Sequence, residues 1–180
     1  MADEQKGGGK WSPDEVKNHV KKVQEAVEKH RREHKGEHFT ALTPEEVEKK
    51  LRRVNSPMIT SQGWGGAPPG GTVNYSVGIY NPDPTQAIWT FAHVWVGSGN
   101  IDPVVGTFLL NVDTRFPRLT QPDFAGLNIP PGGSTTLNFT LAVPASVERT
   151  NYIGNTCLMQ FNWHDVGTYY DRGVFVFKVA

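Results

Sequence analysis

The sequence predicts a mainly β protein, an antiparallel β-sandwich of about seven strands preceded by an α-helical N-terminal arm. Charge is the first indication, because residues 1–56 hold 13 Lys and Arg and 11 Asp and Glu, leaving 5 and 7 for residues 57–180. Apolar residues in the first part recur at helical spacing, whereas those in the second part alternate with polar residues as in strands. Strands and helices do not alternate along the chain, which disfavours a parallel α/β fold.

Composition limits the classes of function. The 180 residues suffice for one core plus an appendage, and a hydrophobic content of 37% argues against global disorder. The net charge of zero gives no electrostatic reason to expect nucleic acid or an anionic membrane as a partner. Cys157 is the single cysteine, so no internal disulfide is expected. The sequence shows neither a signal peptide nor a run long enough to span a bilayer, which favours a cytoplasmic location without membrane insertion.

The arm is expected to start with a helix. Residues 1–11 are polar and Gly-rich and are predicted to form a flexible leader. Ser12, Pro13 and Glu15 then show the pattern of a capping box with proline at the first helical position, and Gly36 offers a stop. Between them, apolar residues recur at spacings of four, three and four: Val16, Val20, Val23 and Val27. So narrow a stripe buries only one face, as in a coiled coil or a helix laid on a partner.

A second, shorter helix repeats the start signal at Thr43 and Glu46 and is expected to end before Pro57. Its apolar stripe consists of Val47, Leu51 and Val54. The two helices predict a charged hairpin arm over residues 12–56. Residues 57–71 are rich in Gly and Pro and are predicted to be a linker.

Residues 72–180 form the predicted sandwich domain. The stretch from Thr72 to Tyr80 sets the pattern, with apolar residues at every second position and a Pro-rich turn after it. Further strands are expected at residues 87–97, 104–112, 134–143, 153–163 and 173–179. An extended piece near residues 58–61 or 124–129 brings the count to about seven, the number typical of an immunoglobulin-like sandwich.

A family resemblance supports this prediction. An early strand ends in Tyr80-Asn81-Pro82, and the segment from Ile129 to Pro144 reads IPPGGSTTLNFTLAVP. Together they resemble the bacterial CARDB-type and related immunoglobulin-like modules, in which a Pro-Gly turn and a Ser/Thr-rich start commonly precede a strand. The resemblance covers the sandwich domain and implies a non-enzymatic spacer, adhesion or assembly part, often in exported proteins. The helical arm is not part of that family's pattern.

One helical segment matches a metal-binding pattern. The residues from His30 to His34 have the H-x-x-E-H spacing of a class of zinc peptidases. A catalytic zinc also needs a third ligand and a dry pocket, but Lys and Arg surround this helix. A polar helix end is therefore the favoured interpretation, and metal capture together with His38 is the weaker alternative. No metal or cofactor is predicted.

The strand around Ile88 to Val96 has two apolar sides. One alternating set contains Ile88, Ala92, Val94 and Val96, and the other contains Trp89, Phe91, His93 and Trp95. Antiparallel sandwich strands usually expose one side to solvent, and that side is usually polar. The second apolar side of this strand is therefore expected to be covered by the arm, another subunit or a ligand. Cys157 alternates in register with Met159 and Phe161 and is predicted to be a small buried residue of the core.

These patterns lead to the hypothesis of a non-enzymatic structural or adaptor subunit that binds a protein partner or assembles with itself. The predicted contacts are the valine stripe and the apolar strand side, that is Val16, Val20, Val23, Val27, Trp89, Phe91 and Trp95. The alternative is a carbohydrate-binding sandwich with exposed aromatic side chains that stack on sugar rings, with Trp64, Trp89, Trp95, Tyr169 and Tyr170 as candidates. No catalytic residue is predicted, because no nucleophile, base and orienting group show a recognisable spacing.

Overall fold

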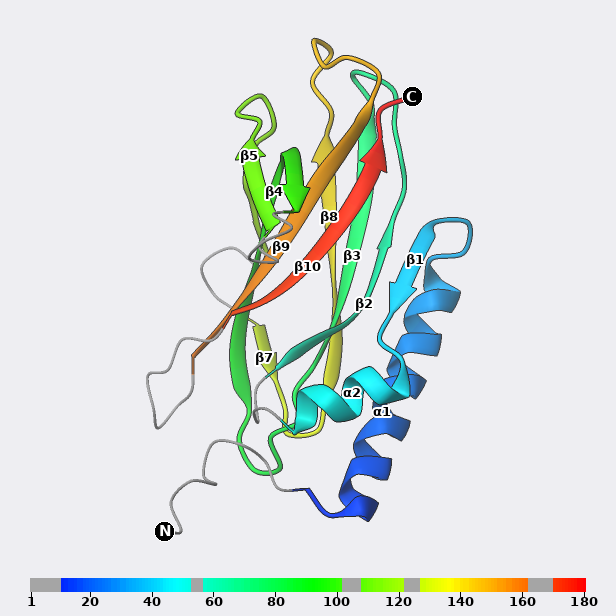
Figure 1. Cartoon of the computed structure of the whole chain (residues 1–180), viewed down its shortest axis with the longest axis vertical. Coiled ribbons are helices and arrows are strands. Elements are labelled where there is room, and N and C mark those ends of the chain that lie inside the picture. The colour runs from blue at the N-terminus through cyan, green and yellow to red at the C-terminus, as the bar shows by residue number, and fades with distance from the viewer. Residues whose placement is uncertain (1–10, 53–56, 102–107, 122–126, 162–169) are drawn as a thin grey trace.

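The computed structural model describes residues 11–52, 57–101, 108–121, 127–161 and 170–180, which form three layers (Figure 1). Two helices cover the outside of a four-stranded sheet, and this sheet packs face to face on a six-stranded sheet. The elements are α1 (Pro13–Glu33), β1 (His38–Ala41), α2 (Pro44–Leu51), β2 (Met58–Trp64), β3 (Thr72–Tyr80), β4 (Ile88–Ile101), β5 (Phe108–Val112), β6 (Leu119–Gln121), β7 (Leu127–Ile129), β8 (Ser134–Ala142), β9 (Asn151–Phe161) and β10 (Tyr170–Lys178). The protein is therefore a mainly β, immunoglobulin-like antiparallel sandwich with a helical arm, as predicted.

All pairings between named strands are antiparallel. The four-stranded sheet has the order β1-β2-β3-β8, and the six-stranded sheet has the order β10-β9-β4-β5, with β6 and β7 also paired to β4. Along one edge β4 pairs with β9. Along its other edge, successive parts of β4 pair with β7, β6 and β5. Nine strands, β2 to β10, lie after residue 57 in the described part of the chain. The predicted count of about seven was too low because β6 was not expected and only one of the two pieces that became β2 and β7 was counted.

The main core lies between the two sheets and is rich in aromatic rings. The Phe175 ring stacks on Tyr75 with ring centroids 3.9 Å apart, and both side chains are buried. The Tyr75 hydroxyl accepts a hydrogen bond from Thr156 Oγ1 at 2.6 Å and donates one to Gln62 Oε1 at 2.7 Å. Burial raises the pKa of Tyr75 above its usual value. These rings therefore stabilise the sandwich rather than a ligand site.

Both helices begin where the capping signals predict. The Ser12 and Thr43 side chains accept hydrogen bonds from the backbone N–H groups of Glu15 and Glu46, whose carboxylates return the contact. After α1, Gly36 has a φ of +87°, which favours glycine. Val54 of the second predicted helix lies outside the described residues. Neither of the two described helices combines the length and the apolar character needed to cross a bilayer.

The valine stripe of α1 faces the protein's own sandwich. Val23 is 1% exposed and Val27 is 6% exposed. Together with α2 and the outer side of the four-stranded sheet they form a second core, whose buried members are Val23, Val27, Val47, Leu51, Met58 and Tyr80. The predictions that Val23 and Val27 contact a partner, or that α1 forms a coiled coil, are therefore wrong, because these side chains are already buried within the chain. Val16 and Val20, nearer the helix start, are partly exposed.

Small residues on the outer side of β2 and β3 let α1 approach the sheet. His30 inserts there with its Nδ1 2.6 Å from Ser61 Oγ and its Nε2 2.8 Å from Ser76 Oγ, and it is 1% exposed. A Cβ at Gly78 would overlap the Ser61 hydroxyl and approach His30 Nδ1 to 3.3 Å. The interpretation of His30 as a solvated helix end or a metal ligand is therefore wrong, because both ring nitrogens are engaged with serine hydroxyls.

The buried imidazole predicts a pH-dependent stability. Burial first, and the nearby His34 second, lower the pKa of His30 from 6.5 to about 4. Between pH 4 and pH 6.5 the His30 side chain binds a proton in the unfolded chain but not in the folded chain. The contribution of neutral His30 to the free energy of unfolding is therefore complete above pH 6.5. It falls as the pH drops toward 4, by about 3 kcal/mol in total.

Urea unfolding between pH 4 and pH 7.5 measures this slope. The variant His30→Gln is expected to be less stable at neutral pH and to have a shallower pH slope than the parent. The control His38→Gln, at an exposed position of β1, is expected to keep the parent slope. Equal slopes in the parent and His30→Gln would contradict this role of His30.

The prediction that residues 57–71 form a linker is wrong, because the first half of this segment forms β2. Met58–Trp64 forms an inner strand of the four-stranded sheet, between β1 and β3. Its pairing register with β3 shifts between Ile59 and Ser61, and this bulge interrupts the alternation that usually reveals a strand. The expected connector between the helices likewise contains β1, which pairs with β2.

Candidate binding face of the six-stranded sheet

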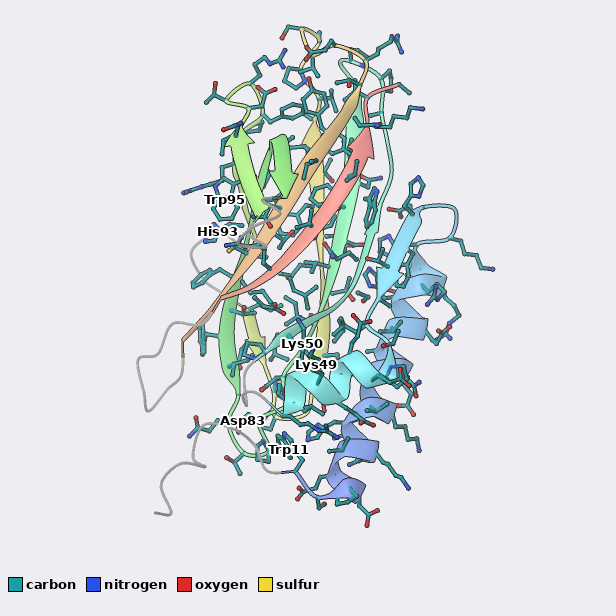
Figure 2. All side chains as sticks on the ribbon, viewed as in Figure 1. Trp11, Lys49, Lys50, Asp83, His93 and Trp95 are labelled. Carbon is teal, nitrogen blue, oxygen red and sulfur yellow. The ribbon has the colours of Figure 1, made fainter. Side chains whose placement is uncertain are left out.

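The central strand β4 separates its two apolar sets onto the two sides of the sheet. Ile88, Ala92, Val94 and Val96 are at most 2% exposed and belong to the main core. The alternating set on the other side, Trp89, Phe91, His93 and Trp95, is only partly buried. Figure 2 shows His93 and Trp95 on the side of the molecule away from the helices. The outer side of β4 is therefore aromatic and only partly buried.

Strand register extends this aromatic surface over β9 and β10. Opposite residues of an antiparallel pair lie on the same side of a sheet. His93 pairs with Cys157, which pairs with Arg172, and Trp95 pairs with Asn155, which pairs with Val174. We call this surface the aromatic face, with the members Trp89, Phe91, His93, Trp95, Ile153, Asn155, Cys157, Arg172, Val174 and Val176.

The helices leave the aromatic face uncovered because they pack on the other sheet. Val174 is 38% exposed and Val176 is 47% exposed, which makes them two of the three large apolar side chains that are well exposed in the described part of the chain. An apolar strand side of this kind is typical of an interaction surface. The sequence analysis expects this side to be covered by the arm, another subunit or a ligand, and the described helices of the arm do not cover it.

Asn155 adds an unsatisfied acceptor to the aromatic face. The residue is 8% exposed, and its Oδ1 atom has no hydrogen-bond partner among the described residues. A buried amide oxygen without a donor costs about 1–3 kcal/mol, so a donor from a bound molecule would stabilise the complex at this point. Asn155 lies between Trp95 and Val174 in register, near the middle of the face.

Two arginines lie at the aromatic face. The Arg118 guanidinium lies 5.9 Å from the centroid of the Trp95 ring, and Arg172 is exposed beside Cys157 in register. Burial first, and Arg118 second, lower the pKa of His93, which favours the neutral imidazole. The face therefore combines apolar rings with two arginines, which suits an apolar partner surface flanked by carboxylates.

Cys157 does not belong to the core, so the sequence prediction for it was wrong. Leu158 and Thr156 are the fully buried residues of this part of β9, and Cys157 is partly exposed beside His93 on the aromatic face. Strand pairing thus brings together a cysteine and a histidine that sequence alone could not relate. Among the described residues no three His, Cys, Asp or Glu side chains are grouped so that they could hold a metal ion.

The carbohydrate-stacking candidates are placed differently. Trp64 is 9% exposed and packs against Phe175 in the main core, so its prediction as a stacking platform is wrong. Tyr169 lies outside the described residues, and Tyr170 is described only as the first residue of β10. Trp89 and Trp95 are the candidates that lie on the aromatic face.

Sequence reasoning missed Asn155, Val174 and Val176. Its error was to assign the odd positions of β9 to the core. The sequence of β10 contains a usable signal, because Phe175 and Phe177 alternate with the smaller Val174 and Val176. The larger rings fill the core and the valines face outward.

Comparisons with known proteins describe the fold. No protein-family model matches the sequence, and no curated protein matches it. Similar solved structures include the C-terminal domain of wzt, with 9% identity and a TM-score of 0.44 over 79% of this chain and 78% of that one. A PapD-like domain of human CEP192 has 14% identity and a TM-score of 0.43 over 71% of this chain and 82% of that one.

A CARDB domain from Pyrococcus furiosus is also among the similar structures. It shares 12% identity with a TM-score of 0.40, over 69% of this chain and 86% of that domain. This is the type of module that residues 129–144 resemble in sequence. The aromatic face is interpreted from its own residues.

Proposed function

We propose that this protein is a non-enzymatic structural or adaptor domain that binds another protein through the aromatic face. The observation that carries the proposal is the arrangement of β4, whose inner side is buried in the core while the aromatic rings of its outer side are only partly buried. The two described helices pack on the opposite sheet and do not cover this side. Trp and Arg are the residue types that most often dominate the binding energy of protein interfaces.

The chemistry of the face defines the partner. Exposed Val174 and Val176 call for apolar contacts, and Arg118 and Arg172 call for carboxylates at the rim. The unpartnered Oδ1 of Asn155 calls for a hydrogen-bond donor near the centre. A protein segment with apolar side chains, a free N–H and flanking Asp or Glu meets all three requirements.

Site-specific photo-crosslinking tests the proposal. A benzophenone amino acid at Val176 is expected to give one discrete cross-linked partner in cells that express the full chain, and the same group at exposed Glu25 of α1 serves as the control. Adding Trp95→Ser is expected to weaken binding about 30-fold, since a central tryptophan commonly contributes 2 kcal/mol or more. The variant's thermal unfolding is measured alongside, so that loss of fold is distinguished from loss of contact.

The outcomes separate this proposal from the carbohydrate alternative. Equal cross-linking from Val176 and Glu25, or a product that Trp95→Ser does not reduce, would argue against a protein-binding face. A glycan that quenches tryptophan fluorescence in the parent but not in Trp95→Ser, without a protein cross-link, would favour carbohydrate binding. The burial of Trp64 already removes one of the aromatic platforms on which that alternative depends.

A further inference from the structure

The strand β8 is an edge of the four-stranded sheet with an unused pairing side. It pairs with β3 along nine consecutive residues, Ser134 to Ala142, without a register shift. No described strand pairs with it on the other side. Every second residue of an antiparallel edge strand directs its N–H and C=O away from its partner, so β8 directs a row of backbone groups away from β3 that no described strand uses.

This edge lacks the features that usually prevent strand addition. Natural edges are commonly short, bulged, or protected by charged residues or proline. The sequence of β8, STTLNFTLA, contains no charged residue and no proline. The edge strand β10 of the other sheet, by contrast, carries Asp171, Arg172 and Lys178, and the edge strand β1 has only four residues.

A hollow of about 310 Å³ lies beside the first half of β8. One wall is the α1 surface with Ala26, Lys29 and Glu33, and the other includes Thr136 and Asn138 of β8. Ser61 and Gly78 also line the hollow, so it lies between α1 and the outer side of the sheet next to β8. One cation and one anion line the hollow, so two such surfaces brought together offer charges of both signs to each other.

We propose that β8 pairs antiparallel with β8 of a second copy of this protein, so that the two four-stranded sheets join across a two-fold axis. An edge strand without charges can oppose its own copy without like-charge repulsion, and a two-fold axis joins identical surfaces. Full pairing of the nine residues places Asn138 opposite Asn138 of the second copy. The side-chain amide is both donor and acceptor, so this central pair is self-complementary.

This contact lies on the other sheet from the aromatic face, so it adds a second interaction surface to the proposed function and does not depend on it. In the proposed register Thr136 of each copy faces Thr140 of the other. Both threonines lie on the outer side of the sheet, where the alternation of β8 leaves them at least partly exposed. Their side chains therefore report on the register without a change to the core.

Light scattering of the full chain over a range of concentrations tests the proposal. The parent is expected to be a dimer. The double variant Thr136→Lys with Thr140→Lys opposes two pairs of like charges and is expected to raise the dimer dissociation constant about ten-fold or more. The double variant Thr136→Lys with Thr140→Glu opposes lysine to glutamate twice and is expected to restore the dimer.

Matched controls keep the result specific. Thr114→Lys with Thr150→Lys adds the same charge at two exposed threonines away from β8 and is expected to leave the dimer intact. Val176→Asp, on the aromatic face, is also expected to leave it intact. A parent that stays monomeric, or a dimer that responds equally to the Lys/Lys and Lys/Glu variants, overturns the pairing of β8 with its copy.

Discussion

Replacing Val23 with Asp is expected to lower the free energy of unfolding by about 4 kcal/mol, from lost apolar burial and the desolvation of a carboxylate. Val23 is 1% exposed and sits in the second core between α1, α2 and the four-stranded sheet. The side chains that pack around it in this cluster are hydrophobic, so a carboxylate at this position would lie against apolar groups. The measurement is urea unfolding at pH 7.5, followed by circular dichroism at both helix and strand wavelengths.

The neighbouring exposed residue provides the control. Gln24→Asp introduces the same carboxylate one position along α1, on the side away from the sheet, and is expected to change stability by less than about 0.5 kcal/mol. If Val23→Asp left unfolding unchanged and only weakened association, the valine stripe would be a partner contact, as the sequence alone predicts. That result would contradict the packing of α1 on its own sandwich.

The helix starts could be predicted because their signals are local. Each capping box is complete within four residues, and the structure contains both of them. The surface on which the valine stripe packs could not be predicted in the same way. α1 approaches the sheet over small residues of β2 and β3, such as Ser61, Ser76 and Gly78. In the sequence these residues show only as the polar side of a strand.

The strands were predicted where alternation is regular, and missed where a register shift or a short length hides it. The predicted strand from Thr72 to Tyr80 agrees with β3, and the predicted strand over 134–143 agrees closely with β8. The bulge in β2 and the three-residue strands β6 and β7 leave little periodic signal. These elements depend on the neighbours with which they pair.

The candidate site was predicted in part. The two apolar sides of β4 were visible in the sequence, and they identify the strand that carries the aromatic face. Which side faces outward, and which residues of β9 and β10 join it, depends on the register of three strands. A one-residue error in the orientation of β9 moved Cys157 to the core and hid Asn155.

A large steric effect is expected at Gly154 of β9. Its position lies under the Phe175 ring, so a Cβ there would overlap the ring atoms. Phe175 is 1% exposed and is held between Tyr75, Trp64 and Phe177, so it has no room to move aside. Gly154→Val is therefore expected to lower the free energy of unfolding by about 3 kcal/mol or more, since forced overpacking displaces neighbouring side chains.

Gly65→Val is the control, because no atom lies within 4 Å of the position that a Cβ would take there. It is expected to change the unfolding midpoint far less than Gly154→Val. The double variant Gly154→Ala with Phe175→Leu is expected to be more stable than Gly154→Ala alone, because the smaller side chain releases the space that the new methyl group needs. If Phe175→Leu brought no recovery, the overlap with this ring would not be the cause. The test therefore asks whether the aromatic core packs directly on the backbone of β9, the strand whose other side carries Asn155 and Cys157 of the aromatic face.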